Sequence, residues 1–439
     1  MRRLRLLCWL LAWACWAWLG ARLYVELPRD FGPAVSVPAT RLNEGLWGFV
    51  AGRDVVLSCE GNYIAGHYRS WDARTGQLLH DWCGSTMGSF LSMKHGVVIG
   101  VKIEEPLREE SDLQWSIFNL VTGRKVPFFQ PVRFLNFHPV KPLAAGLAER
   151  PDNALTLVVV DLHTGMPIEG WGHVFRFQSN EQIRALRWAG DSSEVILLAE
   201  TRERTPNASP NDWESHVRLE RWNASGRTRS IELPRTFTDI ERVADDGRIL
   251  LSARMPTLDD FAVVDSSTGQ LLADVADISG LNGKSPSRRV NVPVLSADGR
   301  ILCTPDGVVW DIDHRRAIWI ARDAFQAVEE ASAETNTMFV TEHWDQLLGG
   351  WNALAPLRTQ AVRDLGTGAL QYRLWRWAPT FPSPSSDGRL AVVGFVGVHQ
   401  LPPQVNLPLF AFCQVVLATP LVMLWCILRW RRNRRAKVA

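Results

Sequence analysis

The sequence has few of the patterns that mark an enzyme. Its ten histidines stand singly, with no His-Glu-x-x-His motif, and its seven cysteines form no Cys-x-x-Cys pair. Gly283-Lys284-Ser285 lacks the earlier glycine of a phosphate-binding loop, because Ile278 occupies that position. Gly84-Ser-Thr-Met-Gly88 is no nucleophile elbow, because Ser85 comes one place too early. We therefore expect no catalytic residue, no metal site and no cofactor.

The chain lacks an excess of positive charge outside its two ends. The net charge at pH 7 is +2. Three arginines lie within the first five residues and six basic residues lie between Arg429 and Lys437, so the remainder carries a net negative charge. A nucleic-acid-binding protein needs Lys and Arg on its working surface to neutralise phosphates. This distribution excludes nucleic acid as an expected partner.

An apolar stretch near the N-terminus is long enough to cross a membrane. Leu6 to Leu23 contains one charged residue, Arg22. As a helix these residues would span about 27 Å, close to the thickness of a bilayer core. A cleaved signal peptide is the alternative, although no small-x-small cleavage pair follows the stretch cleanly. We expect a basic cytoplasmic segment over residues 1–5, a transmembrane signal anchor over 6–24 and a linker over 25–45.

A second apolar stretch lies near the C-terminus. Residues 407–428 carry no charge, and Pro420 is expected to kink the helix. A basic tail follows over residues 429–439. Because Lys and Arg beside apolar spans favour the cytoplasmic side, we expect two spans, with both termini in the cytoplasm. The central region then lies on the outer side of the membrane, which is the periplasm in a bacterium.

The central region repeats one turn pattern, Asp/Asn-x-x-Thr/Ser-Gly. Seven copies begin at Asp72, Asn119, Asp161, Asn223, Asp265, Asp311 and Asp364, and six of them end in Gly76, Gly123, Gly165, Gly226, Gly269 and Gly368. The Asn223 copy is one residue shorter, and the Asp311 copy is degenerate and ends in Arg315. A period of about 40–50 residues is typical of propeller blades. We expect each Asp or Asn side chain to accept hydrogen bonds from its own turn.

A second series of tight polar turns alternates with the first. These turns lie at residues 51–54, 94–96, 138–142, 190–193, 245–248, 297–300, 334–336 and 386–389. The short apolar runs between the two series favour strands buried between packed sheets. One soluble stretch, residues 322–333, is compatible with a short helix, and strand plus turn fits it equally well.

The two series of turns together resemble the WD-repeat and quinoprotein-like propeller superfamily, in which a Trp-Asp or Asp-x-x-Thr-Gly turn joins the third and fourth strands of each blade. The resemblance covers residues 46–397 and implies an all-β propeller of four-stranded antiparallel blades. Eight inner hairpins indicate eight blades, the last completed by a strand from residues 34–42, with seven blades as the alternative. Residues 398–406 then form a linker to the second span.

Three long irregular segments map to one face of such a propeller, opposite the turns. They cover residues 202–216, 279–293 and 345–358. Long loops gathered on one rim of a rigid scaffold are a common place for binding, and insertions without a partner are the alternative. The candidate binding residues on this rim are Trp213, Lys284, Arg288 and Trp351.

Within the repeat region, Cys59 and Cys83 are close enough in sequence to form a disulfide in an oxidising compartment. Thiols without a spacing pattern are more often buried apolar residues. Both interpretations stay open from the sequence.

These observations favour a membrane-anchored, non-catalytic interaction scaffold that binds a protein or peptide outside the cytoplasm. The resemblance also implies an alternative, a quinoprotein-like oxidoreductase with a quinone and calcium in its central funnel, for which we identify no residues. A third hypothesis is an envelope sensor that relays ligand binding through its two helices. The short tail after Leu428 leaves little room for a cytoplasmic output domain.

Overall fold

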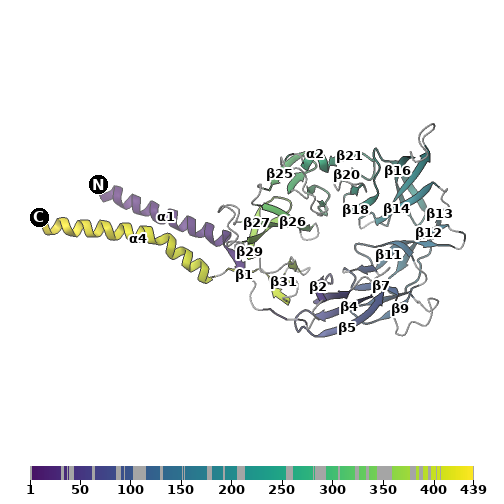
Figure 1. The fold of residues 1–439 in the computed structure, drawn as a ribbon, viewed down its shortest axis with the longest axis horizontal. Coiled ribbons are helices and arrows are strands. Elements are labelled where there is room, and N and C mark those ends of the chain that lie inside the picture. The colour runs from purple at the N-terminus through teal and green to yellow at the C-terminus, as the bar shows by residue number, and fades with distance from the viewer. Residues whose placement is uncertain are drawn as a thin grey trace.

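Tight turns divide the central region into short strands that pair with their neighbours in sequence. The computed structural model describes residues 2–30, 34–36, 38, 44–61, 65–85, 90–92, 94–101, 115–128, 132–150, 152, 154–175, 180–190, 193–204, 213–253, 261–279, 281, 293–304, 307–321, 326–332, 336–343, 358–375, 382–384, 389–393, 397–401, 403–405 and 407–438. Within these residues the strands form small sheets arranged in a ring (Figure 1). The fold is therefore a β-propeller.

Seven sheets contain four consecutive antiparallel strands each, and they are numbered here as blades 1 to 7. Blade 1 contains β2 (Glu44–Phe49), β3 (Val55–Gly61), β4 (Ala65–Asp72) and β5 (Leu78–Ser85). Blade 2 contains β6 (Phe90–Ser92), β7 (Val97–Val101), β8 (Trp115–Asn119) and β9 (Lys125–Pro127). Blade 3 contains β10 (Val132–Phe137), β11 (Leu143–Glu149), β12 (Leu155–Asp161) and β13 (His173–Phe175).

The remaining blades follow in chain order. Blade 4 contains β14 (Glu181–Trp188), β15 (Val195–Arg204), β16 (Trp213–Asn223) and β17 (Gly226–Glu232). Blade 5 contains β18 (Asp239–Val243), β19 (Arg248–Ser252), β20 (Phe261–Asp265) and β21 (Leu271–Asp274). Blade 6 contains β22 (Val294–Leu295), β23 (Ile301–Cys303), β24 (Val308–Asp311) and β25 (Arg316–Ile320). Blade 7 contains β26 (Gln326–Ser332), β27 (Thr337–His343), β28 (Arg358–Asp364) and β29 (Leu370–Trp375).

One further sheet closes the ring between blade 7 and blade 1 (Figure 1). It has three strands, β30 (Pro382–Pro384), β31 (Leu390–Val393) and β32 (Gly397–Gln400). The predicted closing strand at residues 34–42 contributes one isolated bridge within its described part, between Ser36 and Val398. The prediction of eight four-stranded blades is therefore wrong, and seven blades have that form.

The two series of turns occupy the positions that the sequence predicts for them. Turns of the first series join the third and fourth strands of the seven blades, as between β4 and β5. Turns of the second series join first and second strands, as between β2 and β3. The first strands β10, β14 and β18 contact one another in turn, which places the first strand of each blade toward the centre of the ring.

Apolar side chains fill the spaces between neighbouring blades. Val50, Leu57 and Val98 belong to a cluster that joins blades 1 and 2, and the same kind of cluster joins each later pair up to blades 6 and 7. Phe49 and Val398 join blade 1 to the closing sheet. Both faces of most blades are thus buried, which accounts for strands that are apolar along their length.

Three helices complete the described chain. α1 (Arg2–Glu26) and α4 (Leu407–Val438) lie side by side and leave the ring together (Figure 1). The only short helix in the described part of the ring, α2 (Val275–Ser279), follows blade 5 directly. The alternative of a helix over residues 322–333 is wrong, because residues 326–332 form the first strand of blade 7.

One helix among the described residues is long and apolar enough to cross a membrane. It covers Leu407–Arg429, with a mean hydropathy of 2.2. In α1 the apolar segment is shorter and covers Trp9–Ala21. The count of two spans is therefore not confirmed, and one candidate span stands.

Both chain ends join the outer edge of blade 7, which the sequence analysis did not predict. β1 (Pro28–Asp30) pairs in parallel with β29, and β33 (Gln404–Val405) pairs antiparallel with β1. Blade 7 is thereby extended to six strands. Since β1 comes directly after α1 and β33 directly before α4, this one sheet edge positions both long helices.

Cys59 and Cys83 lie on strands of blade 1 and are not joined by a disulfide. Cys83 Sγ lies 3.5 Å from His67 Nε2 on the neighbouring strand. Each sulfur is partly buried, in keeping with the interpretation of these residues as packed thiols.

Candidate functional site

The acidic residues of the repeat are engaged within their own turns. Asp72 Oδ1 accepts hydrogen bonds from the backbone N–H groups of Arg74, at 3.0 Å, and Thr75, at 2.7 Å. The Thr75 N–H lowers the pKa of Asp72 most, because it stabilises the carboxylate. Equivalent backbone bonds are made by Asn119, Asp161, Asn223, Asp265, Asp311 and Asp364.

The glycines that end these turns adopt a left-handed backbone. Gly165 has a φ of 72°, and a Cβ there would lie 2.0 Å from the carbonyl oxygen of Pro127 in the neighbouring blade. Only glycine fits this turn without strain. The other turn glycines also have positive φ angles, namely Gly76, Gly123, Gly226, Gly269 and Gly368.

The predicted loop rim is described only in part. Residues 202–204 and 213–216 belong to β15 and β16, so both ends of the first predicted loop are paired strand and not irregular chain. Trp213 starts β16 and pairs with Arg204. Lys284, Arg288 and Trp351 lie outside the described residues.

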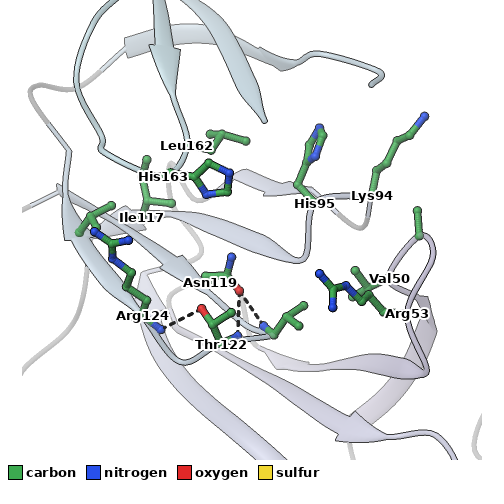
Figure 2. Close-up of a pocket in the computed structure, with 13 residues that line it drawn as sticks. Val50, Arg53, Lys94, His95, Ile117, Asn119, Thr122, Arg124, Leu162 and His163 are labelled. Carbon is green, nitrogen blue, oxygen red and sulfur yellow. Dashed lines mark hydrogen bonds between the residues drawn. The ribbon is translucent and has the colours of Figure 1, made fainter. Parts of the chain in front are cut away.

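A pocket opens on the opposite face, at the turns of blades 1 to 3. Its volume is about 600 Å³. One wall comes from the β2–β3 turn and one from the β6–β7 turn, while the turns after β8 and β12 complete it (Figure 2). Ile117, Val126 and Leu162 are buried side chains that form its apolar part.

Positive charge dominates the edge of this pocket. Arg53, Lys94 and Arg124 are exposed and come from three different turns (Figure 2). None of the thirteen described lining residues is Asp or Glu. The carboxylate next to Arg53 in sequence, Asp54, forms an ion pair with Arg74 at 2.8 Å. The pocket therefore combines an apolar base with unneutralised cations.

His95 adds an uncharged imidazole to the pocket wall. Its Nε2 lies 2.7 Å from the carbonyl oxygen of His138, and since a carbonyl only accepts, Nε2 carries the hydrogen. Burial lowers the pKa of His95, and the positive charges of Lys94 and His163 lower it further, against the opposing effect of the His138 carbonyl. The neutral ring then keeps a lone pair on Nδ1.

Asn119 differs from the other turn residues because it also lines the pocket. Its Oδ1 accepts hydrogen bonds from the N–H groups of Val121 and Thr122, each at 2.9 Å. Figure 2 shows its side-chain nitrogen pointing away from the turn. An amide nitrogen in this position can donate hydrogen bonds to a ligand while its oxygen holds the turn together.

A second charged cluster, in blade 4, serves packing between strands. Glu200 is buried and accepts hydrogen bonds from Arg202 Nε at 2.9 Å and Ser215 Oγ at 2.8 Å, with Arg184 also bound to it. Burial raises the pKa of Glu200, but these three donors outweigh it and the net change is a lowering. Its charge is neutralised by neighbouring strands, unlike the cations at the pocket.

Sequence reasoning missed the pocket because its residues lie far apart in the chain. The signal was one basic residue in each of three turns of blades 1 and 2, at Arg53, Lys94 and Arg124. The sequence analysis interpreted these turns only as connections between strands. In the described part of the chain, no group of three His, Cys, Asp or Glu residues is placed to hold a metal ion.

No family model matches the chain, and no curated protein matches it. The β-propeller domain of the Trilobed protease from Pyrococcus furiosus is similar in structure, with a TM-score of 0.41 and 10% identity over 72% of this chain and 94% of that one. The Dos1 propeller has a TM-score of 0.43 and 10% identity, covering 87% of this chain and 97% of its own. A eukaryotic initiation factor has a TM-score of 0.39 and 15% identity, with coverages of 79% and 89%. At this level the likenesses assign no activity, and membership of the WD-repeat and quinoprotein-like superfamily stays a prediction.

Proposed function

We propose that the chain is a membrane-anchored β-propeller that binds a protein partner outside the cytoplasm and catalyses no reaction. The observation that carries the proposal is the attachment of the ring to its helix pair through the edge of blade 7 (Figure 1). An anchor at one edge holds the ring at the membrane and leaves the faces of the other blades open to a partner. The pocket at blades 1 to 3 lies on one of these faces.

The helix pair supports the anchor. α4 contains the apolar segment Leu407–Arg429, none of which is buried within the molecule. α1 packs against α4 at Gly20, where a Cβ would lie 2.7 Å from Gln414 Nε2. Small residues at such contacts allow membrane helices to approach closely. We therefore include α1 in the proposed anchor as a second span.

The distribution of basic residues supports the orientation. Arg2, Arg3 and Arg5 precede the apolar part of α1, and the basic tail follows that of α4. Lys and Arg beside short loops favour the cytoplasmic side. This places both ends inside and the propeller outside.

Fractionation and protease treatment test the anchor. The full chain is expressed in cells, membranes are washed with alkaline carbonate, and intact cells or spheroplasts are treated with protease. We expect the chain to stay in the washed membranes and the propeller to be cleaved from outside. Release by carbonate, or a propeller that is cleaved only after lysis, would contradict this part of the proposal.

Site-specific photo-crosslinking in the same membranes tests the partner. A photoreactive residue replaces Thr122 at the pocket in one variant and Trp213 in the β15–β16 hairpin in another, so that both faces are sampled. We expect a protein adduct of defined mass from at least one position. A chain that is folded and anchored but gives no adduct at either position would count against a binding role.

A further inference from the structure

The pocket at the turns of blades 1 to 3 carries positive charge that no described residue neutralises. Arg53, Lys94 and Arg124 form no ion pair with any described residue. On the same face the exposed Arg74 differs, because it forms an ion pair with Asp54 at 2.8 Å. Because the chain between its basic ends has a net negative charge, these cations are a local exception. Such a concentration of one sign selects a ligand of the opposite sign.

The remaining lining defines what else the ligand must contain. Ile117, Val126 and Leu162 form an apolar base, and each is less than a tenth exposed. The Asn119 amide can donate a hydrogen bond beside this base (Figure 2). A bare inorganic anion would satisfy the cations and make no use of the apolar lining of the pocket. A ligand with carboxylates and an apolar group next to each other satisfies both.

We propose that this pocket binds an acidic segment of the partner protein, with carboxylate side chains on Arg53, Lys94 and Arg124 and an apolar side chain on the base. The inference rests on the proposed binding function and specifies the chemistry of the partner. The three cations stand on three separate turns, so the ligand must extend across more than one blade. An extended peptide segment has this reach, since each residue adds about 3.3 Å.

The position of the pocket favours a soluble partner over the surface of the membrane. The helix pair leaves the ring at blade 7, whereas the pocket lies between the turns of blades 1, 2 and 3 (Figure 1). Lipid headgroups beside α1 and α4 therefore meet the edge of blade 7 first. An anionic lipid surface is accordingly an outcome that the test must separate from the peptide.

The test uses the full chain in nanodiscs of uncharged phosphatidylcholine. The probe is a fluorescent peptide of alternating Glu and Leu, and the matched probe alternates Gln and Leu. The pocket variant is Lys94→Glu with Arg124→Glu. The control variant is Lys125→Glu with Arg300→Glu, which changes the net charge equally at exposed residues that do not line the pocket. Thermal unfolding of each variant shows that the ring is folded.

Charge at the pocket should decide the affinity for the acidic peptide. We expect the pocket variant to bind the Glu–Leu peptide at least about tenfold more weakly than the unaltered chain, and the control variant to stay within about threefold. Binding should weaken as salt rises from about 50 to 200 mM, because exposed charges are screened. The Gln–Leu peptide should bind at least about tenfold more weakly than the acidic one.

Several results would overturn the inference. Equal losses in both variants would show that net charge and not the pocket attracts the peptide. Free citrate or phosphate that binds as tightly as the peptide, and is lost in the pocket variant, would identify a small anion as the ligand. Pocket-dependent binding of phosphatidylserine vesicles would identify a membrane surface. The peptide could also bind at the pocket while the photo-crosslinking experiment gives no protein adduct. That pair of results would support the acidic-ligand chemistry of the pocket but contradict the proposed role as a scaffold for a protein partner.

Discussion

Blades 3 and 7 have almost the same outer turn, Asp161-Leu-His-Thr-Gly165 and Asp364-Leu-Gly-Thr-Gly368, but they are stabilised differently. The second strand of blade 3, β11, is buried on both faces by apolar neighbours from blades 2 and 4. Blade 7 has apolar contacts with blade 6, and within the described residues no apolar cluster joins it to the closing sheet. The same turn therefore supports two kinds of blade.

Polar groups take over part of the packing in blade 7. Glu342, near the end of β27, is fully buried and forms an ion pair with Arg373 at 2.6 Å. The corresponding end of β11 in blade 3 carries Glu149, which is exposed and paired with Arg133 at 2.5 Å. Blade 7 also carries the edge strands that lead to the helices. Apolar contacts alone bury the second strand of blade 3, whereas blade 7, which leads to the helices, also buries a charge pair, as blade 4 does at Glu200.

Glu342→Gln should have the largest effect on stability. The change removes the charge that balances Arg373, which is 9% exposed. Removing one partner of a buried ion pair leaves the other uncompensated and costs about 3–5 kcal/mol. We expect this loss in the free energy of unfolding, measured by urea or thermal denaturation of the full chain in detergent.

Glu149→Gln is the matched control in blade 3. Both groups of its ion pair are more than half exposed, so we expect a change of at most about 1 kcal/mol. Equal losses in the two variants would mean that the buried pair of blade 7 has no special role in its stability.

Gly165→Ala and Gly368→Ala compare the two outer turns directly. Both residues have positive φ angles, of 72° and 68°. At Gly165 the new Cβ would lie 2.0 Å from the backbone oxygen of Pro127 in blade 2, and at Gly368 it would lie 2.7 Å from the Cβ of Trp319 in blade 6. Because the overlap at Gly165 is much the closer of the two, we expect losses of about 2–4 kcal/mol at Gly165 and about 1–2 kcal/mol at Gly368.

Gly52→Ala provides the reference for these two variants. Its φ is 68° and nothing lies within 4 Å of the added Cβ, so it measures the backbone cost alone. A loss at Gly165 no larger than that at Gly52 would show that the contact with blade 2 relaxes easily.

Val405→Pro tests the edge of blade 7 with a smaller expected effect. Proline removes a backbone donor from β33, which has only two residues and pairs with β1. We expect the free energy of unfolding to change by less than about 1 kcal/mol, because an edge strand contributes little to the ring. Hydrogen exchange at the backbone N–H groups of Arg29 and Asp30 should nevertheless become faster, while Val405→Thr, which keeps the donor, should leave it unchanged.

The blades were predictable because each turn is a local event. Asp72 and Gly76 close their turn with side-chain and backbone groups only a few residues apart, so the sequence pattern reports the structure directly. The apolar runs between the turns then leave few choices for strand position. The four-stranded antiparallel blades were implied by the resemblance to known propellers that these turns carry.

The closure of the ring and the pocket depend on contacts between distant residues. Ser36 pairs with Val398, and Pro28 with Arg373, across almost the whole chain. Strands of two or three residues have no periodicity that a sequence could display. The pocket likewise combines Arg53 of blade 1 with Lys94 and Arg124 of blade 2, which only the packing of neighbouring blades brings together.

Arg315→Gly should have the smallest effect on the free energy of unfolding, and it should stabilise the protein. The change gives the outer turn of blade 6 the final glycine that the turns of blades 3 and 7 share. Arg315 occupies the glycine position with a φ of 49°. A non-glycine residue with such a positive φ destabilises the fold by about 1–2 kcal/mol. Glycine in turn lowers stability by about 0.4–1 kcal/mol, because it increases the conformational entropy of the unfolded chain. We expect a net stabilisation of about 0.5 kcal/mol, measured by thermal unfolding. Arg315→Ala keeps the strain and should give no gain. If both variants were equally stable, loss of the exposed guanidinium would explain the result, and the backbone argument that separates blade 6 from blades 3 and 7 would fail.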